Sequence, residues 1–326
     1  MTGALSSSKL GAPVTGEVVL PATGTQLVVI GGKTTGGTVA SGVFTFDTSS
    51  GTLTQVGDLA TGVEDACGTS IAGQDVVFGG SSPGAVSTVQ GIQVPAATPS
   101  APASLVTATV LGQLPQPRTD EAEATIGSTT YLVGGDSGTG LDPQVLATAD
   151  GRSFVGVATL AEPVQSAAVA AVGSELYVFG GQNLSATGPS SPLDTIQSVD
   201  PRTHRARIVG HLPEPLSGAA AVTVGGQVLV IGGTTTATPN LAPPAGSAGS
   251  SGASTGTSSS VTSPNVWWFN PSTDRASRVA QLPEPVSNAG IAVIGTVVWV
   301  IGGESNGTPV SAVQSLSVTV KRTGRR

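Results

Sequence analysis

Leu176-Tyr177-Val178-Phe179-Gly180-Gly181 decides the fold, because an apolar run closed by a glycine pair recurs along the whole chain. Six runs of this kind occur, and their glycine pairs lie roughly 50 residues apart, a period that indicates stacked structural repeats. The first glycines of the six pairs are Gly31, Gly79, Gly134, Gly180, Gly232 and Gly302.

A leucine about 20 residues before each pair gives the repeat a second fixed point, usually followed at the third position by proline; the clearest copy is Leu212-Pro213-Glu214-Pro215. A run of small residues comes next, as at 166–171 and 217–222. We expect this run to form the innermost strand of a blade, where space is short. The apolar run would be the second strand, continuously apolar because both its faces are covered. The six leucines are Leu10, Leu59, Leu114, Leu160, Leu212 and Leu282.

A hairpin completes each repeat, as at 44–56, 198–208 and 267–279, where Asp or Asn begins the turn. Residues 313–320 supply a third strand to the last repeat, but the fourth is missing there. We therefore expect residues 1–9 to provide it and to close the ring, which would remove exposed sheet edges. Residues 1–320 are predicted to form a single domain. Residues 234–264 are predicted to be a flexible insertion in the fifth repeat, and 321–326 a basic tail.

The apolar run, the glycine pair, the aromatic-Asp strand and the Leu-Pro-x-Pro bend resemble kelch repeats, and they occur in kelch order along the entire chain. This resemblance implies an all-β, six-bladed propeller with four-stranded antiparallel blades. One departure concerns the arginine that usually follows the proline, which remains only as Arg118. No function carried by the family's arginines is therefore expected here.

Composition limits the function classes. The net charge is −7 and only 10% of residues are charged, which disfavours a nucleic-acid-binding surface. One cysteine and two histidines leave too few ligands for a clustered zinc site, and no cofactor is expected. We predict no membrane span and a monomer. The N-terminal residues lack the pattern of a signal peptide. Two locations stay open: the cell envelope or exterior, as part of a longer exported bacterial protein, or the cytoplasm.

The turn before each innermost strand is predicted to face one mouth of the central channel. Blades 1 to 3 are acidic there, whereas blades 4 to 6 carry neutral polar groups. The channel-mouth candidates are Glu17, Glu64, Asp65, Arg118, Asp120, Glu121, Glu123, Gln165 and Asn288. They could bind a cation, an amine or a sugar, or could simply form a hydrated acidic rim. No ligand spacing indicates a metal site.

We expect a non-catalytic binding or scaffold module that presents the channel mouth and the loops 81–102, 136–143 and 183–192 to a protein or glycan. The alternative is a sugar-binding or mutarotase-like enzyme that uses carboxylates at the mouth. No catalytic residue is assigned. His204, in an outer turn, is poorly placed for a nucleophilic triad. The two histidines, His204 and His211, together with two Tyr and one Cys, do not match the copper site of a galactose-oxidase-like enzyme.

Overall fold

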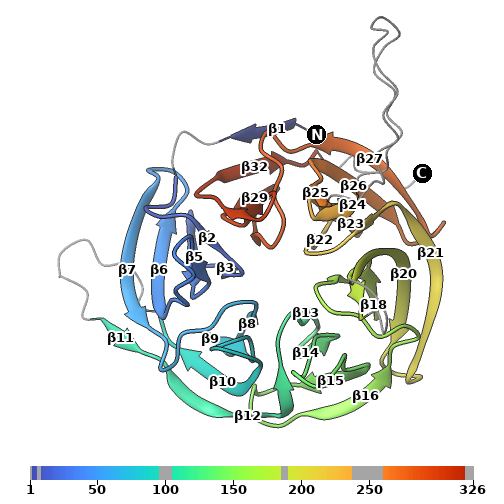
Figure 1. The fold of residues 1–326 in the computed structure, drawn as a ribbon, viewed down its shortest axis with the longest axis horizontal. Coiled ribbons are helices and arrows are strands. Elements are labelled where there is room, and N and C mark those ends of the chain that lie inside the picture. The colour runs from blue at the N-terminus through green and yellow to red at the C-terminus, as the bar shows by residue number, and fades with distance from the viewer. Residues whose placement is uncertain (1, 6–8, 95–104, 185–189, 237–259, 320–326) are drawn as a thin grey trace, which may run out of the picture.

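A computed structural model of the chain describes residues 2–5, 9–94, 105–184, 190–236 and 260–319, and every regular element in these ranges is a β-strand. Six antiparallel sheets surround a central opening (Figure 1). The predicted all-β propeller with six blades is confirmed. None of the described residues forms a helix of the length and apolarity that crossing a membrane requires.

Each blade has four main strands, ordered from the centre outward. The innermost strands are β3 (Val18–Pro21), β8 (Cys67–Ile71), β13 (Ala122–Ile126), β17 (Ala168–Val172), β22 (Ala220–Val224) and β28 (Gly290–Ile294). The second strands are β4 (Gln26–Ile30), β9 (Gln74–Phe78), β14 (Thr129–Val133), β18 (Glu175–Phe179), β23 (Gln227–Ile231) and β29 (Val297–Ile301). The third strands are β6 (Gly42–Asp47), β10 (Val86–Ile92), β15 (Gln144–Thr148), β20 (Ser191–Asp200), β26 (Asn265–Asn270) and β32 (Val313–Ser317). The outermost strands are β7 (Thr52–Asp58), β12 (Thr109–Arg118), β16 (Val155–Thr159), β21 (Arg205–Leu216), β27 (Arg275–Gln281) and β1 (Thr2–Leu5).

Eight further strands are short and lie outside the four main strands of the blades. One of them pairs parallel with the outer edge of β7, and the others belong to loops. They are β2 (Val14–Thr15), β5 (Lys33–Thr34), β11 (Val106–Thr107), β19 (Gln182–Asn183), β24 (Thr234–Thr236), β25 (Ser260–Thr262), β30 (Glu304–Ser305) and β31 (Thr308–Pro309).

The hydrophobic core is divided among the seams between blades. Each of six buried clusters joins residues of two neighbouring blades; for example, Val133 and Val145 of blade 3 pack with Val164 and Val178 of blade 4. The second strands are buried almost throughout, as their uninterrupted apolar sequence predicts. Stability therefore comes from blade-to-blade packing all round the ring.

The glycine pairs fasten one blade to the next. The N–H of each second glycine donates to a carbonyl in the segment that leads into the following blade, and the six bonds of 2.8–2.9 Å complete a circle. The first glycine of each pair has positive φ, and a Cβ there would meet the same carbonyls, for instance Leu216 O at 2.3 Å from a Cβ on Gly180. Only glycine allows both this backbone conformation and this approach. The recurring pair is thus the inter-blade joint.

Two segments differ from the local structure expected. The strands β12 and β21 run on through Leu-Pro-x-Pro to Arg118 and Leu216, where we had expected them to end, but the pairing register shifts across these four residues, so the ladder is irregular at the predicted bend. A residue that precedes proline favours an extended backbone, and each strand accommodates its prolines with a shift of pairing register. The prediction of a loop over residues 81–102 was also wrong in its length, because β10 occupies part of this range.

The predicted insertion begins and ends as a two-stranded ladder in which β24 pairs with β25. Residues 237–259, which make up most of this segment, lie outside the described residues, as do 6–8 of the predicted closing strand and the tail 321–326.

The N-terminal strand β1 lies against β32 in the last blade, with register from Thr2 opposite Ser317 to Leu5 opposite Gln314. We predict that deleting residues 1–9 lowers the free energy of unfolding by about 2 kcal/mol, because several ladder hydrogen bonds are lost at roughly 1 kcal/mol each, less the entropy of ordering the strand. The ring should stay closed, since Gly303 N–H still donates to Val14 O. Thermal melting would measure the loss, with deletion of 321–326 as the control. An unchanged melting temperature would contradict the role of β1.

Candidate functional site at the channel mouth

A closed belt of backbone hydrogen bonds frames one mouth of the channel. Six residues, one from each blade, have φ between 50° and 65°. The N–H of each donates to the carbonyl of its counterpart in the preceding blade at 2.8–3.0 Å, and Gly16 completes the circle by donating to Asn288. Because both backbone groups of every member are used, the belt holds its side chains in fixed places around the mouth. The members of the belt are Gly16, Asp65, Asp120, Ser166, Gly218 and Asn288.

The residue directly after each glycine pair lies beside the belt. It pairs through its backbone with the residue that precedes the belt member, as Ser81 does with Glu64 and Glu304 with Ser287. This pairing brings all six loops between second and third strands to the same face as the mouth. The six residues are Lys33, Ser81, Asp136, Gln182, Thr234 and Glu304.

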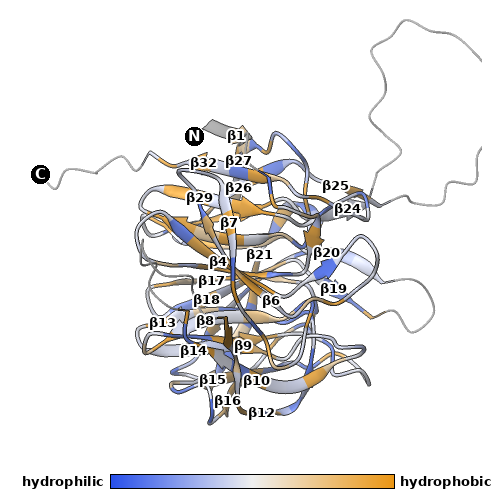
Figure 2. Cartoon of the chain, turned by 90° about the vertical axis from the view of Figure 1, so that its left-hand side faces the viewer, coloured by the Kyte–Doolittle hydropathy of each residue, from blue (hydrophilic) through white to orange (hydrophobic). Residues whose placement is uncertain are grey.

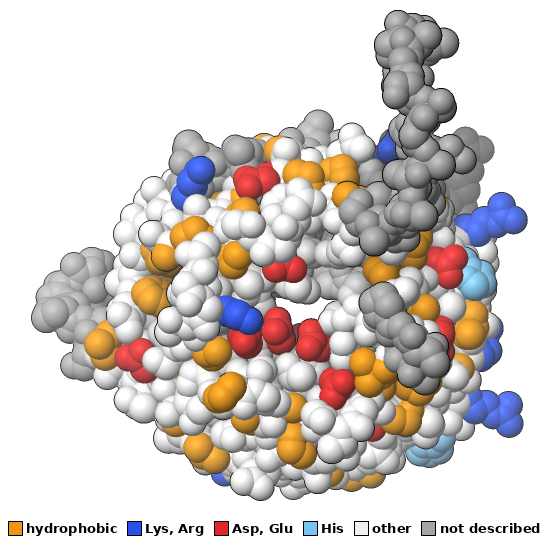
Figure 3. Space-filling model, viewed as in Figure 1, with side chains coloured by type: hydrophobic (Ala, Val, Ile, Leu, Met, Phe, Trp, Pro, Cys, Tyr) orange, Lys and Arg blue, Asp and Glu red, His pale blue; other side chains and the backbone are white. Residues whose placement is uncertain are grey.

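A cavity of about 210 Å³ opens inside the belt. Figure 3 shows Asp and Glu side chains gathered around the central opening, with a basic side chain beside them. Six of the nine predicted residues line this cavity, namely Glu17, Asp65, Asp120, Glu121, Glu123 and Asn288. Glu64, Gln165 and Arg118 do not: the first two lie beside the belt, and the third lies in the seam between blades 2 and 3.

Asp65 and Asp120 are neighbouring members of the belt, and their carboxyl groups influence each other. Burial, together with the charge of Asp120, raises the pKa of Asp65 to about 7. Burial also raises the pKa of Asp120, although Ser166 Oγ opposes this by donating to its Oδ1 at 2.8 Å. Asp65 therefore titrates near neutral pH, and Asp120 keeps its proton to a higher pH than an exposed aspartate does.

A cation already sits at the rim. Lys33 Nζ lies 3.0 Å from Glu64 Oε2. The hydrogen bond with Glu64 and its charge raise the pKa of Lys33, and the charges of Asp65 and Glu304 add to this effect. In the adjacent blade 6, Glu304 accepts a hydrogen bond from the Asn288 amide at 3.1 Å. Sequence reasoning missed Lys33 and Glu304, although their position immediately after a glycine pair was a usable signal.

Glu17 and Glu121 occupy equivalent positions, one residue after the belt, where the other blades have alanine. They are only 5% and 6% exposed, and the Oε2 atom of each has no hydrogen-bond partner. Burial raises the pKa of Glu17 to about 8 and that of Glu121 well above its usual range. Glu17 is therefore mainly a neutral acid at physiological pH, and Glu121 keeps its proton to a higher pH than an exposed glutamate does, contrary to the simple picture of an ionised rim.

Glu123 lies deeper, on β13, and borders both the mouth cavity and a second cavity of about 260 Å³ further along the channel. Burial raises its pKa to about 7. A half-buried acid with this pKa can give up or take up a proton at neutral pH, the property that general acid–base chemistry and cation binding both use.

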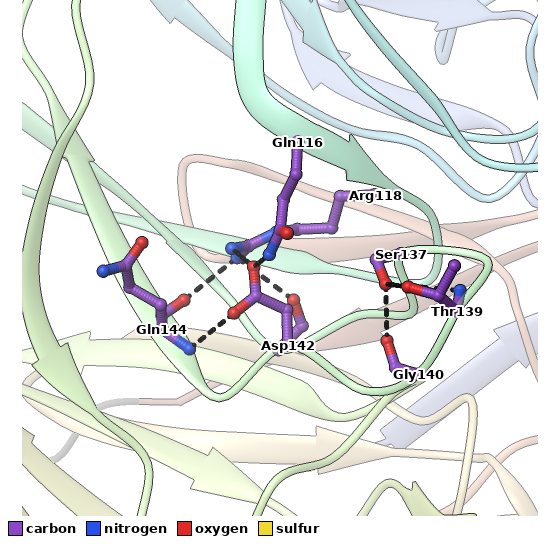
Figure 4. A network of polar contacts seen from close by, with 8 residues as sticks. Gln116, Arg118, Ser137, Thr139, Gly140, Asp142 and Gln144 are labelled. Atoms are coloured by element: carbon purple, nitrogen blue, oxygen red, sulfur yellow. Dashed lines mark hydrogen bonds and ion pairs between the residues drawn. The ribbon is translucent and has the colours of Figure 1, made fainter.

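The sequence suggested that Arg118 lies at the channel mouth, but this prediction was wrong. Its guanidinium is fully buried, pairs with Asp142 and donates to the carbonyls of Gly134 and Gln144 at 3.2 and 3.0 Å (Figure 4). Asp142 also accepts a bond from Gln116. Because Arg118 O accepts from Gly80 N–H of blade 2, this residue ties two blades together. Its role is structural.

The arrangement offers several carboxyl groups in one narrow space, without a convergent metal site. No group of three or more His, Cys, Asp or Glu side chains in the described ranges could hold a metal ion. What the channel can do is accept hydrogen-bond donors and positive charge along the walls of blades 1 to 3.

One comparison with known proteins bears on this fold. The Kelch motif matches residues 163–205, which include all of β17, β18 and β20 in blade 4. The chain is a six-bladed propeller with a kelch motif. Kelch propellers generally mediate protein–protein interactions. In this kelch propeller the matched motif supplies one copy of the inter-blade joint, Gly180-Gly181, and one member of the belt, Ser166.

Proposed function

We propose that this kelch propeller is a binding module that presents the loops around its channel mouth to a protein partner, a glycan being the alternative partner. One observation carries the proposal: all six loops that follow the glycine pairs emerge around the same mouth, each anchored by backbone hydrogen bonds to the residue beside the belt. Figure 2 shows β19, β24 and β25, which come from two blades, on one side of the ring.

Ordered contacts between these loops support the proposal. Thr262 of blade 5 donates its N–H to Asn306 Oδ1 of blade 6 at 3.1 Å, and Asn306 N–H donates to Thr262 Oγ1 at 2.8 Å. Ser137 holds the blade 3 loop by donating to Gly140 O at 2.9 Å. A surface ordered before binding loses less conformational entropy when the partner docks, which favours affinity.

The test compares two faces of the ring. A variant with Ser137, Thr139 and Leu141 replaced by alanine alters the blade 3 loop on the mouth face. A control variant with Arg202 and Thr203 replaced by alanine alters the turn between β20 and β21, at the opposite end of its blade from the loop that carries β19. Partners captured by the intact chain and identified by mass spectrometry would be purified and titrated against all three proteins.

We expect the loop variant to weaken binding about tenfold or more, which corresponds to ~1.4 kcal/mol, and the control to bind like the intact chain. Equal binding by the loop variant, combined with loss in the control, would place the interface on the other face and overturn the proposal.

A further inference from the structure

The turn that joins the third and fourth strands of a blade rests on the outer strand of the preceding blade. In blade 4, His204 Nδ1 lies 2.6 Å from Val157 O of blade 3. In blade 5, Asp274 O lies against Gly210 of blade 4, where a Cβ would approach it to 2.7 Å. His204 and Asp274 hold equivalent places, four residues after the end of the third strand, and both have positive φ. The turn of one blade therefore closes the outer corner of the seam before it.

The seam between blades 4 and 5 shows which side chains meet at such a corner. Burial and Glu175 raise the pKa of Tyr177 to about 12, and the charge of Asp274 adds to this rise whereas that of Arg207 opposes it. Because the effect of a charge falls with distance, Asp274 of blade 5 and Arg207 of blade 4 both lie near the Tyr177 hydroxyl. The corner thus receives a carboxylate from the following blade beside an arginine of the outer strand.

The corresponding corner of blade 5 is a groove of about 380 Å³, a volume within the usual range of ligand sites. Trp268 of this groove packs against the buried cluster that blades 5 and 6 share, so the groove faces blade 6. In the described part of the chain, blade 6 has no turn that could fill it, because its third strand is β32 and its fourth is β1, from the other end of the sequence. The lining includes Gln227, Trp268, Arg275 and Ser277.

Two donor groups in this outer groove are unused. Arg275 is exposed and holds on β27 the position that Arg205 holds on β21, opposite the last residue of the third strand. Among the described residues, neither its guanidinium nor the indole N–H of Trp268 has a hydrogen-bond or ion-pair partner, whereas the indole of Trp267 donates to Glu214. An arginine can hold a carboxylate through two parallel hydrogen bonds, and an indole offers an apolar face with one donor. The groove therefore suits a carboxylate that is carried on a compact segment.

We propose that the outer groove binds an aspartate-bearing turn of a partner protein, with the carboxylate held by Arg275 and the turn packed on Trp268. The chain itself shows the fit, because its own turn with Asp274 fills the matching corner between blades 4 and 5. The groove lies where β23 begins and β26 ends, at the opposite end of blade 5 from the loop that carries β24. It is therefore separate from the mouth-face loops of the proposed function, and either proposal can fail without the other.

Fluorescence anisotropy on the full chain tests the proposal with a labelled cyclic peptide that carries the chain's own turn, Asn-Pro-Ser-Thr-Asp, from residues 270–274. A matched peptide has asparagine in place of the aspartate. The groove variants are Arg275→Gln and Trp268→Ser. The control is Arg205→Gln, which removes the same charge from the equivalent position of blade 4. Thermal melting of each variant establishes that it folds.

We expect the aspartate peptide to bind, and the asparagine peptide and each groove variant to weaken binding about tenfold, while Arg205→Gln leaves it unchanged. No binding by the intact chain, equal affinity for the two peptides, or an equal loss in Arg205→Gln would each overturn the proposal. Deletion of residues 321–326 should not alter the affinity. A clear gain on this deletion would assign the groove to the chain's own tail and overturn the assignment to a partner.

Discussion

Replacing Gly180 by alanine should lower the free energy of unfolding by roughly 3–5 kcal/mol. Alanine at φ of +58° costs about 1 kcal/mol. Its Cβ would lie 2.3 Å from Leu216 O, so the joint between blades 4 and 5 must open, at about 1–3 kcal/mol for overpacking. That movement also weakens the 2.8 Å bond from Gly181 N–H to Leu216 O, for about 1 kcal/mol more.

The same blade offers a matched control. Gly173 has φ of +62°, but nothing lies within 4 Å of a Cβ there, so Gly173→Ala should cost only the backbone term of about 1 kcal/mol. Urea denaturation of both variants would separate close approach from backbone strain. If the two substitutions cost the same, the glycine pairs would matter for their φ angles alone and not as inter-blade joints.

The second large effect is a loss of stability as pH rises. The pKa of Glu17 goes from about 4.5 in the unfolded chain to about 8 in the folded one, because burial disfavours its ionised form. The neutral acid costs the fold nothing extra below pH 4.5. Between pH 4.5 and 8 the unfolded chain loses the proton first, and stability falls by up to ~1.4 kcal/mol per pH unit. Asp65 and Glu123, with pKa values raised to about 7, act in the same direction.

Denaturant titrations at pH 5, 6, 7 and 8 would measure this decline, which we expect to total several kcal/mol. Glu17→Gln imitates the neutral acid, so this variant should have a shallower profile and exceed the intact chain in stability at pH 8. Asp194→Asn, an exposed change, should leave the profile unchanged. A flat profile for the intact chain would show that Glu17 is ionised and hydrated in the fold.

The blade architecture was predictable because the same geometric need recurs six times. Gly180-Gly181 and its counterparts mark the end of every second strand, and the small residues at 166–171 mark an innermost strand. Each signal has a steric cause. A carbonyl group lies against the first glycine of each pair, and the innermost strands crowd around the axis. A repeated cause leaves a repeated pattern, which composition or length alone would not reveal.

The features that could not be predicted depend on the direction in which a side chain points. Arg118 lies two residues before the mouth residue Asp120, yet its side chain turns into the seam to meet Asp142, a partner 24 residues away. The sequence predicted Glu121 and Glu123 as acids near the axis. It did not show that the Oε2 atom of Glu121 is buried without a hydrogen-bond partner. Spacing locates a backbone position, whereas rotamer and neighbours decide what a side chain meets.

The belt has an evolutionary consequence. It is built entirely from main-chain groups, and its members differ freely in side chain, from Gly16 and Gly218 through Ser166 and Asn288 to Asp65 and Asp120. The one demand on each position is tolerance of a left-handed backbone, which Gly, Asn and Asp meet most readily. Mutation can therefore rewrite the chemistry of the entrance, one blade at a time, while the scaffold that displays it is inherited unchanged.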